Sequence, residues 1–409
     1  QYDCGRRISP LRCSKPVSRH AQIGDSGVSV FAIRNARIFD GSDFLADHAV
    51  LVNDGKIDAI IADGSVPDGI ETIEGKGQTL APGLIDVQVN GGGGVLLNDA
   101  PDVETIKTMV AAHRKFGTTA MLPTLITDTR EKMEAAITAV QEAIDGDLPG
   151  VIGIHLEGPY LNHQRRGVHP DDQIRHMEDD AIELLSSLRN GRTLVTLAPE
   201  NVAKGAIKEL VARNVLVCAG HTAGTYEDMM SAIDEGMQGF THLYNAVSPL
   251  SHRAPGVVGA ALSDDRTWCG LIADGYHVHP AVIKASVRAK AKGKMMLVTD
   301  AMPTVGAIEK RFKLGEEEII AVDGRCALAD GTLAGSDLDM ISAVRNCMGM
   351  AEVGLDEALR MASLYPAQFL GLDHVLGRLA PGYQADMILF DDQFAVTRSW
   401  VKGTELACV

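Results

Sequence analysis

The 409-residue sequence predicts an α/β fold, a (β/α)8 TIM barrel with a small β-sandwich domain formed from both chain ends. Short apolar segments alternate with helical patterns in the middle of the chain, and strand-like segments with turn signals occupy both ends. A doubly wound parallel sheet is the alternative for the middle. We expect residues 28–80 and 377–409 to form the small domain and residues 81–376 to form the barrel.

The two ends carry the pattern of antiparallel strands. "SVFAIRNARIFDG" and "HAVLVNDGKIDAII" begin after residue 28, and Asn53-Asp54-Gly55 is typical of a hairpin turn. "GRLAPGYQADMILFDD" and "VTRSWVKGTEL" have the same character near the C-terminus. Residues 1–27 are rich in Arg and Ser and lack periodicity and an apolar run, so we expect this segment to be disordered or non-native.

The middle of the chain alternates between two periodicities. Short apolar runs predict strands at residues 84–90, 119–127, 151–158, 194–199, 215–222, 239–246, 269–275 and 296–302. Helical periodicity appears at residues 103–117, 131–144, 203–214 and 225–237. Residues 303–376 are expected to hold the last helices and an insertion.

Composition and charge exclude several classes of function. Hydrophobic residues make up 45% of the chain and charged residues 22%, as in globular proteins. No apolar stretch is long enough to span a membrane. The formal net charge of −16 argues against a nucleic-acid partner, because phosphate backbones need a basic surface. Seven scattered cysteines without a CxxC pair favour reduced thiols and a cytoplasmic location.

Glu157 places a charge at the end of a buried strand. It follows the apolar run "VIGIHL" and precedes Gly158-Pro159. An unpaired buried carboxylate costs several kcal/mol, so Glu157 needs a partner. A salt bridge at the strand end, a metal ion and a catalytic proton transfer would each meet that need.

Polar or ionisable residues sit at the ends of six of the eight predicted strands. In a (β/α)8 barrel these ends meet at one face, where active sites lie. The residues are Gln88, Asn90, Glu157, His221, His242, His277 and Asp300. Glu157, His221 and His242 form a two-histidine, one-carboxylate set that suits a catalytic divalent ion, most often zinc and sometimes ferrous iron. Asp300 is then placed to act as general acid and base.

Longer motifs resemble a known family. "LAPGLIDVQVNG" and "GRLAPGYQADMILFD" are similar to the first-strand and closing segments of the amidohydrolase superfamily. More narrowly, "HLEGPYLN", "GVHP", "TLAPE", "AGHTAG", "THLYNAV", "HRAPG", "IADGYHV" and "LVTDAM" resemble the N-acetylglucosamine-6-phosphate deacetylases. The resemblance runs from about residue 31 to the end of the chain.

The resemblance implies metal-dependent hydrolysis of the acetamide of N-acetyl-D-glucosamine 6-phosphate to D-glucosamine 6-phosphate and acetate. It implies ligand positions for Glu157, His221 and His242. It also implies an acid/base position for Asp300 and a position at which His169 polarises the acetyl carbonyl. The alternatives are an N-acetylgalactosamine-6-phosphate deacetylase, another amide hydrolase of the superfamily, and a non-catalytic scaffold.

The same resemblance implies how the sugar phosphate is held. The corresponding positions are occupied by Asn245, the backbone of Ala246, Arg253 and His277. Arg253 would act within its own chain or across the interface of a homodimer. A homodimer is expected because it fits the family and because dimers are the commonest oligomers. The expected partner is thus a small amino sugar phosphate, with no nucleic acid and no membrane.

The first predicted strand departs from the wider superfamily. Many members carry His-x-His there and bind two metals, whereas this chain has Gln88-Val89-Asn90. Amide side chains are poor ligands beside imidazole. We therefore predict one divalent ion per chain. Zn²⁺ is the expected ion, and Fe²⁺ is the alternative. Gln88 and Asn90 are expected to form hydrogen bonds around the site rather than to bind the ion.

Three weaker signals favour structural roles. The Gly91–Gly94 run lacks the Lys-Ser/Thr of a phosphate-binding loop, so a flexible strand-to-helix loop is expected. His113 is expected to be structural, and His155 to pack beneath the site without binding a metal.

Overall fold

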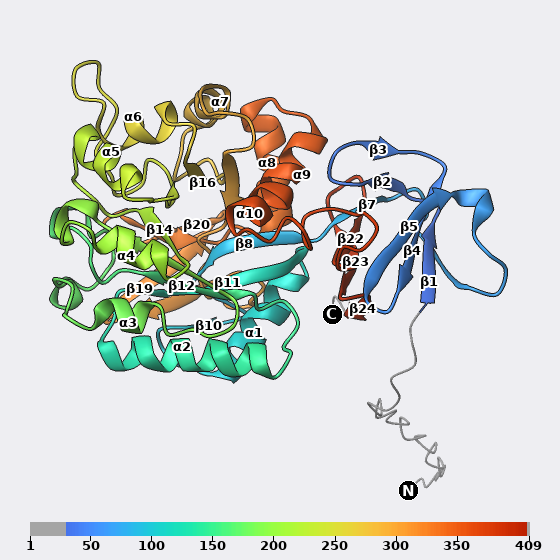
Figure 1. The fold of residues 1–409 in the computed structure, drawn as a ribbon, viewed down its shortest axis with the longest axis horizontal. Helices are drawn as coiled ribbons and strands as arrows, with labels where there is room; N and C mark the ends of the chain where they lie inside the picture. The colour runs from blue at the N-terminus through green and yellow to red at the C-terminus, as the bar shows by residue number, and fades with distance from the viewer. Residues whose placement is uncertain (1–29, 407–409) are drawn as a thin grey trace, which may run out of the picture.

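The computed structural model describes residues 30–406 and contains a barrel and a smaller all-β domain (Figure 1). The prediction for residues 1–27 lies outside the described residues. Both ends of the described chain lie in the small domain, which confirms the predicted fold class (Figure 1). Within residues 30–406, every helix is too short or too polar to span a lipid bilayer.

The small domain consists of two sheets. The first contains, in spatial order, β5 (Lys56–Ala62), β4 (His48–Asn53), β1 (Val30–Arg34) and β6 (Glu71–Glu74). The second contains β24 (Thr404–Leu406), β23 (Val396–Val401), β22 (Met387–Phe390), β7 (Thr79–Pro82), β2 (Arg37–Phe39) and β3 (Phe44–Leu45). Ile33 and Val50 of the first sheet and Leu80 and Trp400 of the second belong to one buried core. This burial of apolar side chains from both sheets holds the two chain ends together.

Eight parallel strands form the barrel, and neighbours in the chain are neighbours in space. They are β8 (Leu84–Val89), β11 (Thr118–Ile126), β12 (Gly153–Glu157), β13 (Arg192–Leu197), β14 (Val215–Ala219), β15 (Gly239–Phe240), β16 (Trp268–Ile272) and β17 (Met295–Val298). Each lies within or overlaps a predicted strand. The seam between β8 and β17 closes at their ends, where the Asp300 amide donates to the Gln88 carbonyl (3.0 Å) and the Asn90 amide to the Ala301 carbonyl (2.9 Å).

Helices surround the barrel (Figure 1). They are α1 (Val103–Arg114), α2 (Arg130–Asp145), α3 (Ala181–Leu185), α4 (Ala206–Ala212), α5 (Tyr226–Asp234), α6 (Gly256–Ser263), α7 (Pro280–Ala289), α8 (Met340–Ala351), α9 (Leu355–Ala362) and α10 (Leu364–Phe369). Side chains of Asp102, Thr129 and Thr225 accept hydrogen bonds from the first turns of α1, α2 and α5, which is why these helices begin where they do. The helix after β12 is only five residues long, and a loop of about 20 residues before it carries His169.

The expected insertion is an antiparallel sheet. It consists of β18 (Arg311–Leu314), β19 (Glu317–Val322), β20 (Arg325–Ala327) and β21 (Leu333–Ser336). The last of these strands returns to the barrel, where the Ser336 amide donates to the Asp300 carbonyl (2.9 Å) and the Met302 amide to the Ser336 carbonyl (3.0 Å). The insertion is thereby attached to the strand end that carries Asp300.

The glycine run forms a hairpin rather than the flexible loop that the sequence suggested. Strand β9 (Gly91–Gly92) pairs antiparallel with β10 (Val95–Leu96). His113 of α1 is fully buried beneath it, and its Nε2–H donates to the Gly91 carbonyl (2.8 Å). A Cβ at Gly92 would lie 2.7 Å from that nitrogen, so the close packing requires glycine. The structural role expected for His113 is confirmed.

Acid should destabilise the protein partly through His113. Burial lowers the pKa of His113 to about 4, whereas an unfolded histidine has a pKa of about 6.5. The stability that depends on neutral His113 is therefore complete above pH 6.5 and falls as the pH drops toward 4. Between pH 6.5 and 4 the unfolding free energy of the wild type should fall by up to about 3 kcal/mol more than that of His113→Gln.

Urea denaturation at several pH values measures this difference. His155 is buried with a similarly lowered pKa of about 4, but it is present in both proteins and cancels in the comparison. If the unfolding free energies of the two proteins change equally with pH, the assignment to His113 is contradicted.

Candidate active site and metal centre

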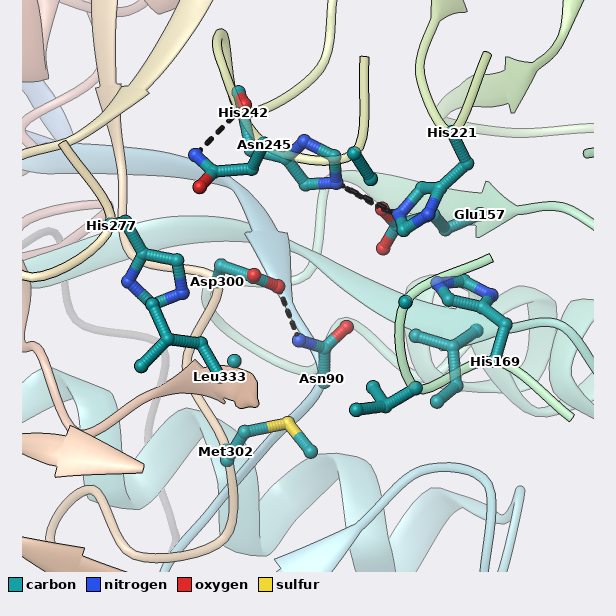
Figure 2. Close-up of a pocket in the computed structure, with 15 residues that line it drawn as sticks. Asn90, Glu157, His169, His221, His242, Asn245, His277, Asp300, Met302 and Leu333 are labelled. Atoms are coloured by element: carbon teal, nitrogen blue, oxygen red, sulfur yellow. Dashed lines mark hydrogen bonds and ion pairs between the residues drawn. The ribbon is translucent and has the colours of Figure 1, made fainter. Parts of the chain in front are cut away.

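A cavity of about 270 Å³ lies at the C-terminal ends of the barrel strands (Figure 2). Its lining includes nine of the predicted site residues: Asn90, Glu157, His169, His221, His242, Asn245, Ala246, His277 and Asp300. They lie at the ends of β8, β12, β14, β15, β16 and β17 or in the loops that follow, and they are far apart in the sequence. The parallel strands bring them together because all these strands end at the same face of the barrel.

Two predicted site residues do not line this cavity. Gln88 is buried, and its Nε2 donates to Glu157 Oε2 (3.2 Å) and to Asp300 Oδ1 (3.1 Å), so it connects the two carboxylates. Arg253 is exposed on the loop between β15 and α6 and does not line the cavity of its own chain. The structure therefore does not bring Arg253 to the other site residues within one chain.

Glu157, His221 and His242 converge on one point. His221 Nε2 lies 3.2 Å and His242 Nε2 2.9 Å from Glu157 Oε1, and the two nitrogens are 3.0 Å apart. Figure 2 shows the two rings and the carboxylate directed at one another. Burial alone would raise the pKa of Glu157, but its contacts with His221 and His242 hold that pKa well below the usual value. The carboxylate is therefore ionised.

The tautomer of His221 shows why this arrangement fits a cation. His221 Nδ1 lies 2.8 Å from the Arg165 carbonyl oxygen, which can only accept a hydrogen bond, so Nδ1 carries a proton. A neutral His221 then directs the lone pair of Nε2 at the Glu157 oxygen. Two acceptors facing each other repel unless a proton or a metal ion lies between them. Such a donation from the other ring nitrogen is also typical of metal-binding histidines.

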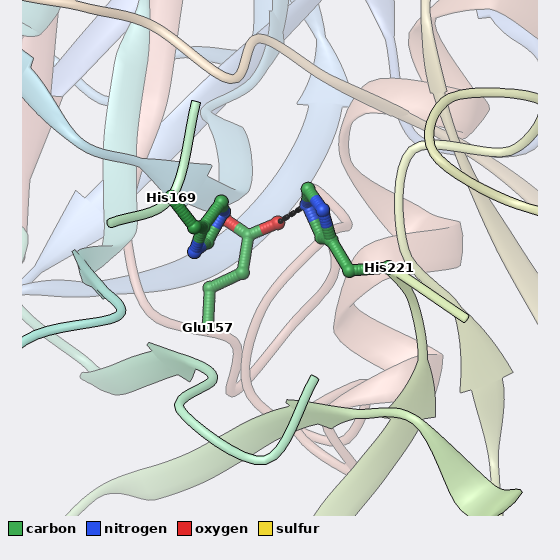
Figure 3. A group of neighbouring side chains, drawn as sticks. All are labelled: Glu157, His169 and His221. Carbon is green, nitrogen blue, oxygen red and sulfur yellow. Dashed lines mark hydrogen bonds and ion pairs between the residues drawn. The ribbon is translucent and has the colours of Figure 1, made fainter. Parts of the chain in front are cut away.

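His169 is the other histidine close to Glu157. Glu157, His169 and His221 also offer ligand atoms within 4.8 Å of one another, and Figure 3 shows the carboxylate between the two rings. The Thr127 amide, however, lies 3.3 Å from His169 Nδ1 and can only donate to it, and the Thr127 hydroxyl lies 2.8 Å from the same nitrogen. With Nδ1 as the acceptor of both groups, the ring proton is on Nε2. Burial and the neighbouring His221 lower the pKa of His169 well below its ordinary value. His169 is therefore a neutral ring with an N–H donor, which suits a developing oxyanion better than a metal ion.

Asp300 lies in the same cavity, bordered by amide side chains. Asn90 Nδ2 donates to Asp300 Oδ1 (2.7 Å), as does Gln88 Nε2 (3.1 Å). Burial and the negative charge of Glu157 raise the pKa of Asp300 above that of an ordinary aspartate. A raised pKa favours a group that must both take up and release a proton.

Several of these side chains come from strained backbone. His221, His242, Ala246 and Asp300 have φ angles of 48°, 29°, 52° and 53°, in the left-handed region that non-glycine residues rarely adopt. Such conformations cost about 1–3 kcal/mol each and persist only where the surroundings hold them. Their concentration at one face of the barrel is typical of a functional site.

At another side of the cavity, His277 is fixed by a carboxylate that the sequence reasoning missed. Its Nδ1 lies 2.6 Å from Asp274 Oδ2, and the two side chains are only 6% and 4% exposed. The other oxygen of Asp274 accepts from the amides of Tyr276 and His277 (2.8 and 2.9 Å). His277 Nε2 is thereby free to contact a ligand. The spacing of Asp274 and His277 in "IADGYH" was the available signal.

The sequence reasoning also missed the apolar walls and the groups that orient the histidines. Ile126, Val168, Met302 and Leu333 line the cavity. Thr127 and the backbone carbonyl of Arg165 fix the two histidine tautomers. No pattern in the sequence marks a backbone carbonyl, because every residue has one.

The model of the amidohydrolase family matches residues 79–406, and that of the NagA composite domain matches residues 30–80. The chain belongs to the amidohydrolase family and is an enzyme of that family. Within it, the chain is grouped with proteins named N-acetylglucosamine-6-phosphate and N-acetylgalactosamine-6-phosphate deacetylase. These findings confirm the resemblance seen in the sequence.

Two curated relatives and one solved structure define this similarity. The N-acetylgalactosamine-6-phosphate deacetylase of Shewanella sp. (strain ANA-3) is 46% identical over 80% of this chain and 82% of that protein. The N-acetylglucosamine-6-phosphate deacetylase of Haemophilus influenzae is 35% identical over 91% of this chain and 98% of that protein. The crystal structure of N-acetylglucosamine-6-phosphate deacetylase from Pasteurella multocida superimposes with a TM-score of 0.90 at 36% identity, covering 92% of this chain and all of that one. The family and the Glu/His cluster together indicate a site for a divalent metal ion.

The positions of His242 and His169 around Glu157 predict different effects of mutation on metal binding. We expect His242→Asn to lose bound metal, because it removes a nitrogen that faces Glu157. We expect His169→Asn to retain metal and to lose turnover instead. Elemental analysis of the purified proteins after dialysis measures both. Loss of metal from His169→Asn with retention by His242→Asn would reverse the assignment.

Proposed function

We propose that this chain hydrolyses the acetamide of an N-acetylhexosamine 6-phosphate, N-acetyl-D-glucosamine 6-phosphate first, to the amine and acetate. The observation that carries the proposal is the convergence of Glu157, His221, His242 and Asp300 in one cavity. Relatives with that activity in their names, 35% identical or more over most of the chain, support it.

The galacto epimer is the second candidate substrate. The Shewanella relative, at 46% identity, is named for N-acetylgalactosamine 6-phosphate, whereas the Haemophilus relative is named for the gluco compound. The two sugars differ only in the orientation of one hydroxyl group. Both are therefore included in the test below.

We assign the metal site to Glu157, His221 and His242, with one divalent ion per chain, Zn²⁺ before Fe²⁺. Gln88 and Asn90 direct amide N–H groups at carboxylates, which supports their role as hydrogen-bond donors outside the ligand set. When bound, the ion supplies Lewis acidity, which lowers the pKa of water and polarises a carbonyl.

The chain's own residues provide the proton transfers. Asp300 takes a proton from the attacking water and returns it to the departing nitrogen as the C–N bond breaks, so no net proton is lost from the enzyme. His169 directs its Nε2–H toward the acetyl oxygen and stabilises the negative charge that develops there. Leu333 and Met302 form an apolar wall that limits water near the reacting amide.

The phosphorylated end of the sugar anchors the substrate. Asn245, Ala246 and His277 line the cavity and offer hydrogen-bonding groups to it. Binding energy from this remote end holds the acetamide in place for reaction. We propose that Arg253, exposed in its own chain, completes this anchor from the second subunit of a homodimer.

A cytoplasmic location completes the proposal. Cys218, Cys269, Cys326 and Cys347 are buried and unbridged in the structure, which supports the expectation of reduced thiols. Cys4, Cys13 and Cys408 lie outside the described residues.

Acetate release tests the function directly. We expect the purified protein to release acetate from N-acetylglucosamine 6-phosphate, to lose this activity with a chelator and to regain it with Zn²⁺. The galacto epimer, assayed in parallel, shows by the ratio of the two kcat/KM values which sugar is preferred. Failure to release acetate from either sugar with the metal bound would refute the proposal.

Replacement of Asp300 tests the acid/base assignment. Asp300→Asn keeps the shape of the side chain but cannot accept the proton, so we expect kcat to fall by about 10²- to 10⁴-fold. Metal content should stay at the wild-type level, because Asp300 is not in the proposed ligand set. Turnover close to that of the wild type would defeat the assignment.

A further inference from the structure

Glu200 is a carboxylate near the metal centre for which the proposed chemistry has no use. It lies in the short 3-10 turn Pro199–Asn201 that follows β13, within the motif "TLAPE". Its carboxylate accepts hydrogen bonds from Asn162 Nδ2 (2.9 Å), Thr222 Oγ1 (2.5 Å) and the Ala223 amide (2.8 Å). Its partners are thus donors on two separate loops.

Both of these loops hold His221. Thr222 and Ala223 directly follow His221, whose left-handed backbone (φ 48°) must be held by its surroundings. On the other side, the Asn162 amide donates to the His221 carbonyl (2.9 Å). The loop that contains Asn162 also contains Arg165, whose carbonyl accepts from His221 Nδ1.

Thr222 extends the connection to the substrate side of the cavity. Its amide donates to the Ala246 carbonyl (3.1 Å), and its hydroxyl accepts from the Gly224 amide (3.0 Å) while donating to Glu200. The Glu200 carboxylate therefore ties the loops after β12 and β14 to each other, and through Thr222 to the turn after β15.

We propose that Glu200 is a positioning residue for the metal centre, which fixes the backbone of His221 so that its Nε2 meets Glu157 and His242. The proposal rests on the proposed metal site but not on the identity of the sugar. Ligands held by outer hydrogen bonds bind metal more tightly, and removal of such bonds typically costs 10- to 100-fold in affinity. Without Glu200, the strained segment at His221 is free to relax and its nitrogen leaves the ligand position for part of the time.

Zinc affinity is the decisive measurement. We expect Glu200→Ala to bind Zn²⁺ about 10-fold or more weakly than the wild type in competition with a chromogenic chelator. Thr222→Val keeps the side-chain shape but removes the hydroxyl, and should shift affinity in the same direction. Glu200→Gln retains an acceptor oxygen and should restore most of the affinity. At saturating Zn²⁺, the kcat of each variant should return to within a few-fold of the wild type.

Glu235 provides a matched control. It is also partly buried, and both of its carboxylate oxygens accept from the Gly205 amide (3.0 and 3.1 Å), away from the metal loops. Glu235→Ala removes a comparable carboxylate, so it should leave zinc affinity unchanged. Thermal denaturation of the metal-free proteins checks that the variants fold alike.

Wild-type zinc affinity in Glu200→Ala, or an equal loss in Glu235→Ala, would overturn the proposal. If Glu200→Ala does not fold, Thr222→Val decides, and unchanged affinity in that variant overturns the proposal as well. A wild-type protein that binds zinc but releases no acetate would refute the proposed function while leaving this comparison valid. A wild-type protein that takes up neither Zn²⁺ nor Fe²⁺ would refute both.

Discussion

The structure depends on a buried carboxylate that faces two imidazole nitrogens. Glu157 is 2% exposed and lies within 3.2 Å of the Nε2 atoms of His221 and His242. An ionised group this deep in the protein is costly unless an opposite charge compensates it. The contacts with His221 and His242 provide part of this compensation, since they hold the pKa of Glu157 low, and in the proposed metal site a divalent ion would supply the rest. The strand ends and loops around these three groups hold them close together.

Backbone groups determine the tautomers of His221 and His169. The Arg165 carbonyl keeps a proton on His221 Nδ1 and leaves Nε2 as an acceptor, whereas the Thr127 amide keeps the proton of His169 on Nε2. Two chemically identical side chains, with ring centroids 4.3 Å apart, thereby present a lone pair and an N–H group, which suit the proposed ligand and the proposed donor. The long loop after β12 is essential to this division because it contributes both His169 and Arg165.

The closing seam of the barrel positions Asp300, the proposed proton-transfer group. Asp86 of β8, with no exposed surface, accepts from Thr299 Oγ1 (2.5 Å), and Ser336 Oγ donates to the Thr299 carbonyl (2.6 Å). Burial raises the pKa of Asp86 to about 7. These contacts join β8, β17 and the inserted strand β21 directly before Asp300. The insertion thus helps to fix Asp300, and its residues Leu333 and Gly335 line the cavity.

The sequence alone determined the barrel, since short apolar runs and helical periodicity alternate along the middle of the chain. It also placed Glu157, His221, His242 and Asp300 at strand ends that must meet. It did not determine the glycine hairpin over His113, the exposed position of Arg253, or the apolar wall at Leu333. Those features depend on loop paths and on contacts between distant segments. The histidine tautomers were decided only by the tertiary structure. Their partners are backbone groups, which every residue has, and only the folded chain determines which of these groups lies beside each ring.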